Sequence, residues 1–302
     1  MEETSQHSID TDSTPSFSLT NNNYTKHFQY RVGTTLSLIF CLAINAIHGS
    51  EIGKEANKYP NQITPSGWAF SIWAVIYTLL ILLTLYQIFL PTETIEKIVK
   101  ECHYYFALSN VLNGLWVVTF AGGYIWFSTV VIASLLCVNV VIQIHAKSWE
   151  VARLSSNELV DVLLVDVSYS LYNGWLSVAT IVNVTVGIVS CNGGEYGKFI
   201  ACLAAAGMVL VAMVLNLVWM FRRGDPVFPC VFVWAAFAIR DTHIGEAADD
   251  DDKLVANVCL GAIAVVVLSN ILLVKLVYTR VNERRMKGLS FSSNLLPRNT
   301  SG

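Results

Sequence analysis

Long uncharged apolar runs, separated by short polar segments, divide this chain into eight candidate membrane helices. Most runs are close to the roughly 20 residues that an α-helix needs to cross the ~30 Å hydrocarbon layer of a bilayer. The pattern predicts spans at residues 30–48, 68–90, 104–120, 124–144, 162–189, 199–221, 226–239 and 254–275. We therefore expect an all-α fold, a polytopic membrane helix bundle with eight transmembrane helices.

Two parts of this pattern are open to more than one interpretation. Residues 104–144 contain no charge and are too long for one crossing, and the Ala-Gly-Gly sequence at 121–123 predicts a tight turn between two antiparallel spans. The run at 226–239 is short and contains two prolines. It either crosses the membrane or re-enters the side from which it came.

The distribution of Lys and Arg favours eight crossings, because basic residues concentrate in cytoplasmic loops. With the N-terminus inside, thirteen basic residues lie on the cytoplasmic side: Lys26, Arg31, Lys97, Lys100, Lys147, Arg153, Arg222, Arg223, Arg280, Arg284, Arg285, Lys287 and Arg298. The other side holds five, namely Lys54, Lys58, Lys198, Arg240 and Lys253. If 226–239 did not cross, the two sides would be nearly equal. We therefore expect both termini in the cytoplasm.

Composition supports the bilayer as the solvent of this protein. Of its 302 residues, 54% are hydrophobic and 14% are charged, against roughly 45–50% and 25% in soluble domains. The net charge is −3 and the basic residues are scattered in short clusters, so we expect no nucleic-acid partner.

Metal chemistry and catalysis are not indicated by the polar residues. Five of the seven cysteines lie within or beside apolar runs, where free Cys acts as a small hydrophobe, so a disulfide framework is not expected. The six histidines lack the paired spacings of a metal site, and we expect neither a metal nor a cofactor. Because no nucleophile, acid–base pair or metal triad is visible, we do not expect an enzyme.

Aromatic and polar stripes run along one face of three predicted spans, since residues three or four apart share a helix face. The stripes consist of Phe70, Trp73 and Tyr77; Asn113, Trp116 and Phe120; and Tyr172, Trp175, Ala179 and Asn183. Any one stripe is explained by helix packing or by an interfacial aromatic belt. The belt does not explain Asn173 and Asn183, which lie well inside a span and need partners from other helices. Together the stripes predict a pocket for a flat apolar ligand.

The three segments that carry these stripes resemble the tryptophan-rich sensory protein and translocator protein (peripheral benzodiazepine receptor) family. TPSGWAFSIWAVIY is similar to that family's second-helix signature, SNVLNGLWVVTF to its third helix and LYNGWLSVATIVN to its fifth. The resemblance implies a five-helix bundle that binds porphyrins, sterols or related flat hydrophobic molecules. On this basis the ligand-binding residues are Trp68, Phe70, Trp73, Tyr77, Asn113, Trp116, Phe120, Tyr172, Trp175 and Asn183.

The chain departs from the family pattern at three points. Ser66 stands where a second proline is usual, the interval from Trp68 to Trp73 is one residue shorter, and three further spans follow the fifth. This resembles a longer branch of the family. The expected organisation is a disordered tail at 1–29, a five-helix membrane core at 30–190, a three-helix membrane extension at 191–279 and a cytoplasmic tail at 280–302.

Asp166 is the acidic residue that lies well inside an apolar run, and intramembrane carboxylates are candidates for function. Either the helix extends into water and Asp166 reaches its surface, or its carboxylate couples protons or orients a ligand. The second interpretation makes a proton-coupled secondary transporter of a small solute the alternative function. Against it, no inverted repeat is evident, and the span count disfavours a seven-helix receptor.

Two further features concern partners. Small residues at 204–207 offer a packing face for another helix or for a homodimer. The Leu-Val-Tyr-Thr-Arg sequence at 276–280 matches a loose sterol-contact pattern, which a Tyr and Arg anchor at a helix end explains equally well. The expected partners are therefore the bilayer and a hydrophobic small molecule.

Overall fold

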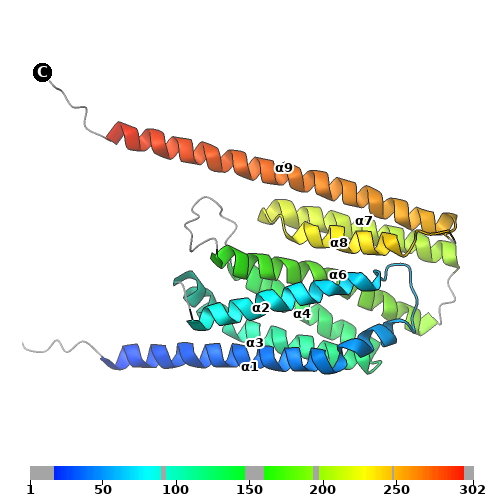
Figure 1. Cartoon of the computed structure of the whole chain (residues 1–302), viewed down its shortest axis with the longest axis horizontal. Helices are drawn as coiled ribbons and strands as arrows, with labels where there is room; N and C mark the ends of the chain where they lie inside the picture. The colour runs from blue at the N-terminus through cyan, green and yellow to red at the C-terminus, as the bar shows by residue number, and fades with distance from the viewer. Residues whose placement is uncertain (1–16, 90–92, 147–159, 193–196, 247, 296–302) are drawn as a thin grey trace, which may run out of the picture.

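The computed structural model describes residues 17–89, 93–146, 160–192, 197–246 and 248–295, which form helices and their connections (Figure 1). In chain order these are α1 (Phe17–Ala56), the 3-10 helix η1 (Gly67–Ser71), α2 (Ile72–Phe89), α3 (Glu93–Ala121), α4 (Ile125–Ala146), the π-helical segment η3 (Val162–Val167), α6 (Ser168–Asn192), α7 (Lys198–Arg223), α8 (Phe228–Asp241) and α9 (Asp250–Leu295). The described residues contain no strand, and the predicted helical bundle is confirmed.

The helices form a five-helix core and a three-helix extension that lie side by side (Figure 1). In the core, α1 packs along α3, α3 along α4 and α4 along α6. In the extension, α9 packs against both α7 and α8. Two clusters of buried apolar side chains are present, one mainly in the core and one mainly in the extension, and α8 contributes side chains to both. Helix α8 contacts α6 as well as α9 and so joins the two parts.

Among the residues that the structure describes, six helices are long and apolar enough to cross a membrane, namely those at Phe28–Ala56, Gly67–Phe89, Ile125–His145, Leu163–Cys191, Lys198–Arg223 and Asp250–Arg280. The eight predicted crossings are thus supported in part. Helix α3 carries buried polar residues, including Asn110 and Asn113, which lower its hydropathy. Helix α8 has 14 residues, a length of about 21 Å at 1.5 Å per residue.

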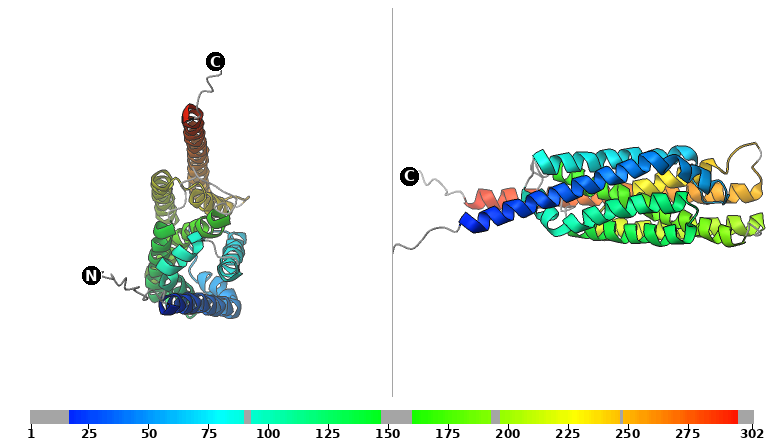
Figure 2. Two further views of the ribbon diagram at one scale, coloured as in Figure 1. Left: turned by 90° about the vertical axis from the view of Figure 1, so that its left-hand side faces the viewer. Right: turned by 90° about the horizontal axis from the view of Figure 1, so that it is seen from below.

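The beginning of α1 and the end of α9 lie at the same end of the bundle (Figures 1 and 2). An even number of antiparallel passes produces this arrangement. The turn predicted at 121–123 is present, and Gly123 adopts φ +78°, where a residue without a Cβ is favoured. A second glycine, Gly174 of α6, allows α8 to approach closely, because a Cβ there would lie 2.8 Å from Cβ of Val231.

Both long terminal helices extend beyond their predicted limits. Helix α1 begins at Phe17 and not at residue 30, and α9 continues to Leu295 through much of the predicted cytoplasmic tail. The polar composition of 17–29 indicated disorder, but a helix already formed in the membrane extends without a new nucleation step. The rest of the predicted N-terminal tail, residues 1–16, lies outside the described residues.

The acidic segment at 249–252, at the start of α9, forms ion pairs and hydrogen bonds with nearby groups. Nζ of Lys198 lies 2.8 Å from Asp249 Oδ2 and 2.7 Å from Asp252 Oδ2. The hydrogen bond from Lys198 lowers the pKa of the Asp249 carboxyl to about 2. The backbone N–H of Asp252 donates to Asp249 Oδ1 at 3.0 Å. The acidic residues therefore stabilise the N-terminus of α9, where negative charge is favoured.

Candidate ligand-binding site

The three predicted stripes meet inside the five-helix core, with Trp73 of α2 at their centre. Its ring stacks on Tyr77 at a centroid distance of 5.3 Å and on Trp116 of α3 at 6.0 Å. The rings of Tyr172 and Trp175, both on α6, lie edge-on to it at 5.9 and 6.5 Å. Three helices that are distant in sequence thus contribute rings to one cluster.

Two more predicted residues complete this aromatic cluster. Phe70 lies in η1, immediately before α2, and meets the Trp175 ring edge-on at 5.6 Å. Phe120 lies one turn after Trp116 on α3, and their rings are 6.0 Å apart. Edge-on and offset contacts at such distances are favourable arrangements of aromatic rings.

A polar network next to the cluster is centred on the amide of Asn113, which is fully buried. Its Nδ2 donates to the Tyr172 hydroxyl at 2.8 Å, and its Oδ1 accepts from Nδ2 of Asn45 at 2.8 Å. The Tyr77 hydroxyl lies 2.8 Å from Asn45 Oδ1 and 3.2 Å from Asn113 Oδ1. Asn113, Tyr77 and Tyr172 were expected to contact the ligand, but their polar groups bond one another. Asn45, on α1, was not predicted because no recognisable segment surrounds it.

Asn183 joins three helices at the other end of the cluster. Its Oδ1 accepts from Nε1 of Trp116 at 2.9 Å, and its Nδ2 donates to Thr129 Oγ1 at 2.7 Å. The amide therefore fixes the orientation of the Trp116 ring between α3 and α6. The partner hydroxyl on α4 was not predicted, because a single Thr in an apolar run carries no distinguishing signal.

The cluster borders a small cavity, called here the aromatic cavity. It is lined by Ile52, Ala56, Thr64, Pro65, Phe70, Trp73, Trp116, Phe120, Trp175, Val178, Ala179, Val182 and Asn183. Its free space is about 40 Å³, close to the ≈ 30 Å³ that one water molecule occupies in the liquid. Sites for drug-sized ligands hold about 300–1,000 Å³. The rings fill the site in this state, and a ligand must separate them.

One polar atom in the cavity wall has no hydrogen-bond partner in the structure. Trp175 is 1% exposed and lines the cavity, and its Nε1 makes no hydrogen bond. A buried donor without an acceptor costs about 1–3 kcal/mol. Such unsatisfied buried groups are few in native proteins, and each one calls for an explanation.

Five predicted residues do not line the cavity. Tyr77, Asn113 and Tyr172 belong to the polar network described above, and the other two are Trp68 and Asp166. Trp68 is 44% exposed and packs edge-on against Trp234 of α8 at 4.8 Å, with its Nε1 donating to Asp241 Oδ2 at 3.1 Å. Asp166 is 1% exposed and lies in η3. The structure therefore buries Asp166 but does not place it in the wall of the aromatic cavity.

The segment at 57–66 covers the cavity through Thr64 and Pro65, and α8 holds this segment in place. The Ser66 N–H donates to the Ala238 carbonyl at 3.1 Å, and its Oγ donates to Asp241 Oδ2 at 2.8 Å. A proline at position 66 would lack that N–H. The departure from the family pattern at this position thus coincides with a contact to the extension.

Replacing Asp241 by alanine will loosen this covering segment. The substitution removes the acceptor of both Ser66 Oγ and Trp68 Nε1, so local opening becomes easier. We expect amide hydrogen exchange at 57–66 to accelerate several-fold, while exchange in α4 stays unchanged. Asp250→Ala, at an exposed carboxylate, is the matched control. Equal exchange in wild type and Asp241→Ala would mean that this contact does not hold the segment.

Comparison with known proteins identifies one match. A family model described as "TSPO-like protein" matches residues 31–272, well over half of the chain. Neither the curated proteins nor the solved structures contained a match. The matched region includes all three aromatic stripes and also α7, α8 and most of the apolar part of α9.

Proposed function

The chain belongs to the TSPO-like family, and we propose that it is a translocator-type membrane protein that binds a planar hydrophobic ligand in the aromatic cavity. Porphyrins and sterol-like molecules are the ligand classes that suit a wall of stacked rings. The ligand would take the place of ring–ring contacts around Trp73. We propose a binding protein and not an enzyme.

The observation that carries this proposal is the unpartnered indole N–H of Trp175 in an otherwise apolar aromatic wall. A ligand that placed a carbonyl or carboxylate oxygen beside Nε1 would supply the missing acceptor. Its flat face would at the same time replace the rings that separate. The preferred ligand is therefore planar and apolar, with a hydrogen-bond acceptor at its edge.

We also propose a membrane topology with eight crossings and both termini in the cytoplasm. Helix α3 would cross with its polar face toward the bundle, since Asn110 and Asn113 bond to other helices, and with apolar side chains on its exposed face. Helix α8 would cross as a short helix covered by α6 and α9. The common position of the beginning of α1 and the end of α9 supports an even number of passes (Figure 2).

Ligand binding is favoured over proton-coupled solute transport by the position of Asp166. This carboxylate was the expected coupling group, and it does not line the aromatic cavity.

Replacing Trp175 by phenylalanine tests the proposed hydrogen bond. A smaller aromatic ring remains and the N–H is removed, so affinity for protoporphyrin IX should fall about tenfold, which corresponds to 1.4 kcal/mol. The stability of the ligand-free protein should not fall in parallel, because the N–H has no partner to lose. The affinity is measured by titration of the porphyrin absorption band, and stability by thermal unfolding in detergent.

The matched control is Trp126→Phe, at an indole that lies outside the cavity and bonds Cys191 Sγ. This control should leave affinity unchanged. If Trp175→Phe binds the porphyrin as tightly as wild type does, the indole N–H does not contact the ligand and the proposed site is wrong.

A further inference from the structure

A second, larger cavity lies at the seam between the five-helix core and the three-helix extension. This seam cavity has about 380 Å³ of free space, within the range of small-molecule sites. It is lined by Pro60, Asn61, Gln62, Ile63, Thr185, Ile188, Val189, Lys198, Ile200, Ala201, Ala204, Ala205 and Met208. Most of this wall is apolar, and its polar side chains come from the covering segment and from the ends of α6 and α7.

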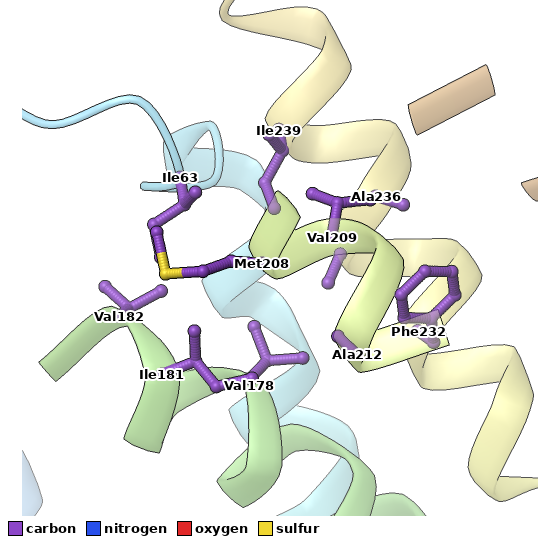
Figure 3. A pocket seen from close by; sticks show the side chains of 11 residues that line it. Ile63, Val178, Ile181, Val182, Met208, Val209, Ala212, Phe232, Ala236 and Ile239 are labelled. Atoms are coloured by element: carbon purple, nitrogen blue, oxygen red, sulfur yellow. The ribbon is translucent and has the colours of Figure 1, made fainter. Parts of the chain in front are cut away.

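A third, small cavity shares lining residues with the seam cavity, and its own lining is drawn in Figure 3. This intermediate cavity has about 40 Å³ of free space, and its wall is apolar throughout. It lies among α6, α7, α8 and the covering segment, and is lined by Ile63, Val178, Ile181, Val182, Met208, Val209, Ala212, Phe232, Ala235, Ala236 and Ile239.

The three cavities share walls in a fixed order. Ile63 and Met208 line both the seam cavity and the intermediate cavity. Val178 and Val182 line both the intermediate cavity and the aromatic cavity. In Figure 3 the Met208 side chain points from α7 toward Ile63 and Val182. The side chains that neighbouring cavities share are all apolar.

The shared side chains act as two partitions, the first formed by Ile63 and Met208 and the second by Val178 and Val182. These side chains differ in how easily they move. Met208 has three side-chain torsions, and methionine adapts readily to its surroundings. Val178 and Val182 lie one helical turn apart on α6 and are restricted at χ1 because they are β-branched. Ile63, which shares the first partition with Met208, is β-branched as well. Met208 is therefore the most adaptable of the four side chains, and its rotation would join the seam cavity to the intermediate one.

We propose that the seam cavity is the entry vestibule for hydrophobic ligands, which pass Met208 and then the two valines to reach the aromatic cavity. The inference rests on the proposed function and assigns the extension a role in it, because α7 forms one wall of the route. The occupant is the same planar apolar molecule that binds among the rings. The polar edge of this ligand would lie near Asn61 and Gln62, two polar residues that line the seam cavity.

The test uses association and dissociation rates, since widening or narrowing a route changes both rates and leaves the equilibrium affinity unaltered. The full chain in lipid nanodiscs is mixed with protoporphyrin IX, and the porphyrin absorption band is followed by stopped flow. Met208→Ala widens the first partition and should raise both rate constants several-fold. Ala204→Phe places a ring in the seam cavity and should lower both several-fold. In each case the dissociation constant should stay close to that of wild type.

Two matched variants control for general effects of the substitutions. Met213 lies on α7 as Met208 does, but it lines none of the three cavities, and Met213→Ala shortens its side chain. Val211→Phe adds a ring on the exposed face of α7. Both should bind at wild-type rates. A misfolded protein cannot bind faster, so the Met208→Ala result does not depend on the fate of Ala204→Phe.

Three outcomes overturn the route. Wild-type rates in both Met208→Ala and Ala204→Phe would place the entry elsewhere. A changed dissociation constant in Ala204→Phe with unchanged association would make the seam part of the bound site. Absence of porphyrin binding in the wild-type protein would remove the proposed function, and the route with it, whereas the first two outcomes leave the function intact.

Discussion

Replacing Trp73 by alanine will weaken protoporphyrin IX binding by about 100-fold, a loss of about 3 kcal/mol. The Trp73 ring contacts four other rings from α2, α3 and α6. A planar ligand inserted at this centre would stack on its indole, and each such contact contributes about 0.5–1.5 kcal/mol beyond the apolar area that it buries. No other ring in the cluster has as many neighbours, so this substitution should have the largest effect on binding.

The measurement is an equilibrium titration of the porphyrin absorption band, which does not depend on tryptophan fluorescence. Trp73→Phe keeps a stacking face and should recover most of the affinity. Trp126→Ala, at an indole outside the cavity, should bind as wild type does. Unchanged affinity in Trp73→Ala would exclude the aromatic cavity as the binding site, whatever the result for the indole N–H of Trp175.

Replacing Asp225 by alanine will lower the free energy of unfolding by about 3–5 kcal/mol. Asp225 is fully buried just before α8. Its Oδ2 accepts hydrogen bonds from Ser170 Oγ, from Gln143 Nε2 at 3.1 Å and from Trp219 Nε1 at 3.3 Å. Its Oδ1 accepts from the backbone N–H groups that begin α8, at 2.9 and 3.2 Å.

This carboxylate joins the core to the extension, because its partners lie on α4, α6, α7 and α8. Removing it takes an acceptor from five donors, of which Gln143 Nε2 keeps a second one in Ser170 Oγ. Asp225→Asn keeps an acceptor for the backbone donors of α8 and should recover part of the stability. Unfolding is followed in mixed detergent micelles, with Asp250→Ala as the exposed control. A loss no larger than in that control would show that water or other groups replace the carboxylate.

The membrane class and the identity of the main site residues follow from local sequence. Uncharged runs near the length of a bilayer crossing leave few alternatives to helices, since backbone groups in hydrocarbon must bond within their own segment. The aromatic stripes on α2, α3 and α6 were visible because helical spacing places residues three or four apart on one face. The resemblance named the family, and the family match confirms it.

The terminal helices and the crossing count were less predictable from sequence. Hydropathy marks the segment that lies in lipid and not the length of the helix, so the predicted ends of α1 and α9 were too short. For α3 and α8, polar residues or short length weaken the signal because neighbouring helices cover them. Such helices do not need an apolar surface on every side, so composition alone underestimates the number of membrane crossings.

Sequence by itself determined that this chain is a helical membrane protein of a recognisable family, with rings on three helices facing one interior. Only the tertiary structure decided which buried polar groups have hydrogen-bond partners within the protein. It pairs Asn113 with Tyr172 and leaves the N–H of Trp175 without an acceptor. It also places Trp68 and Ser66 on Asp241 and reveals Asp225 as the link between core and extension. Hydrogen bonds between helices more than fifty residues apart depend on packing geometry, and no local spacing encodes them.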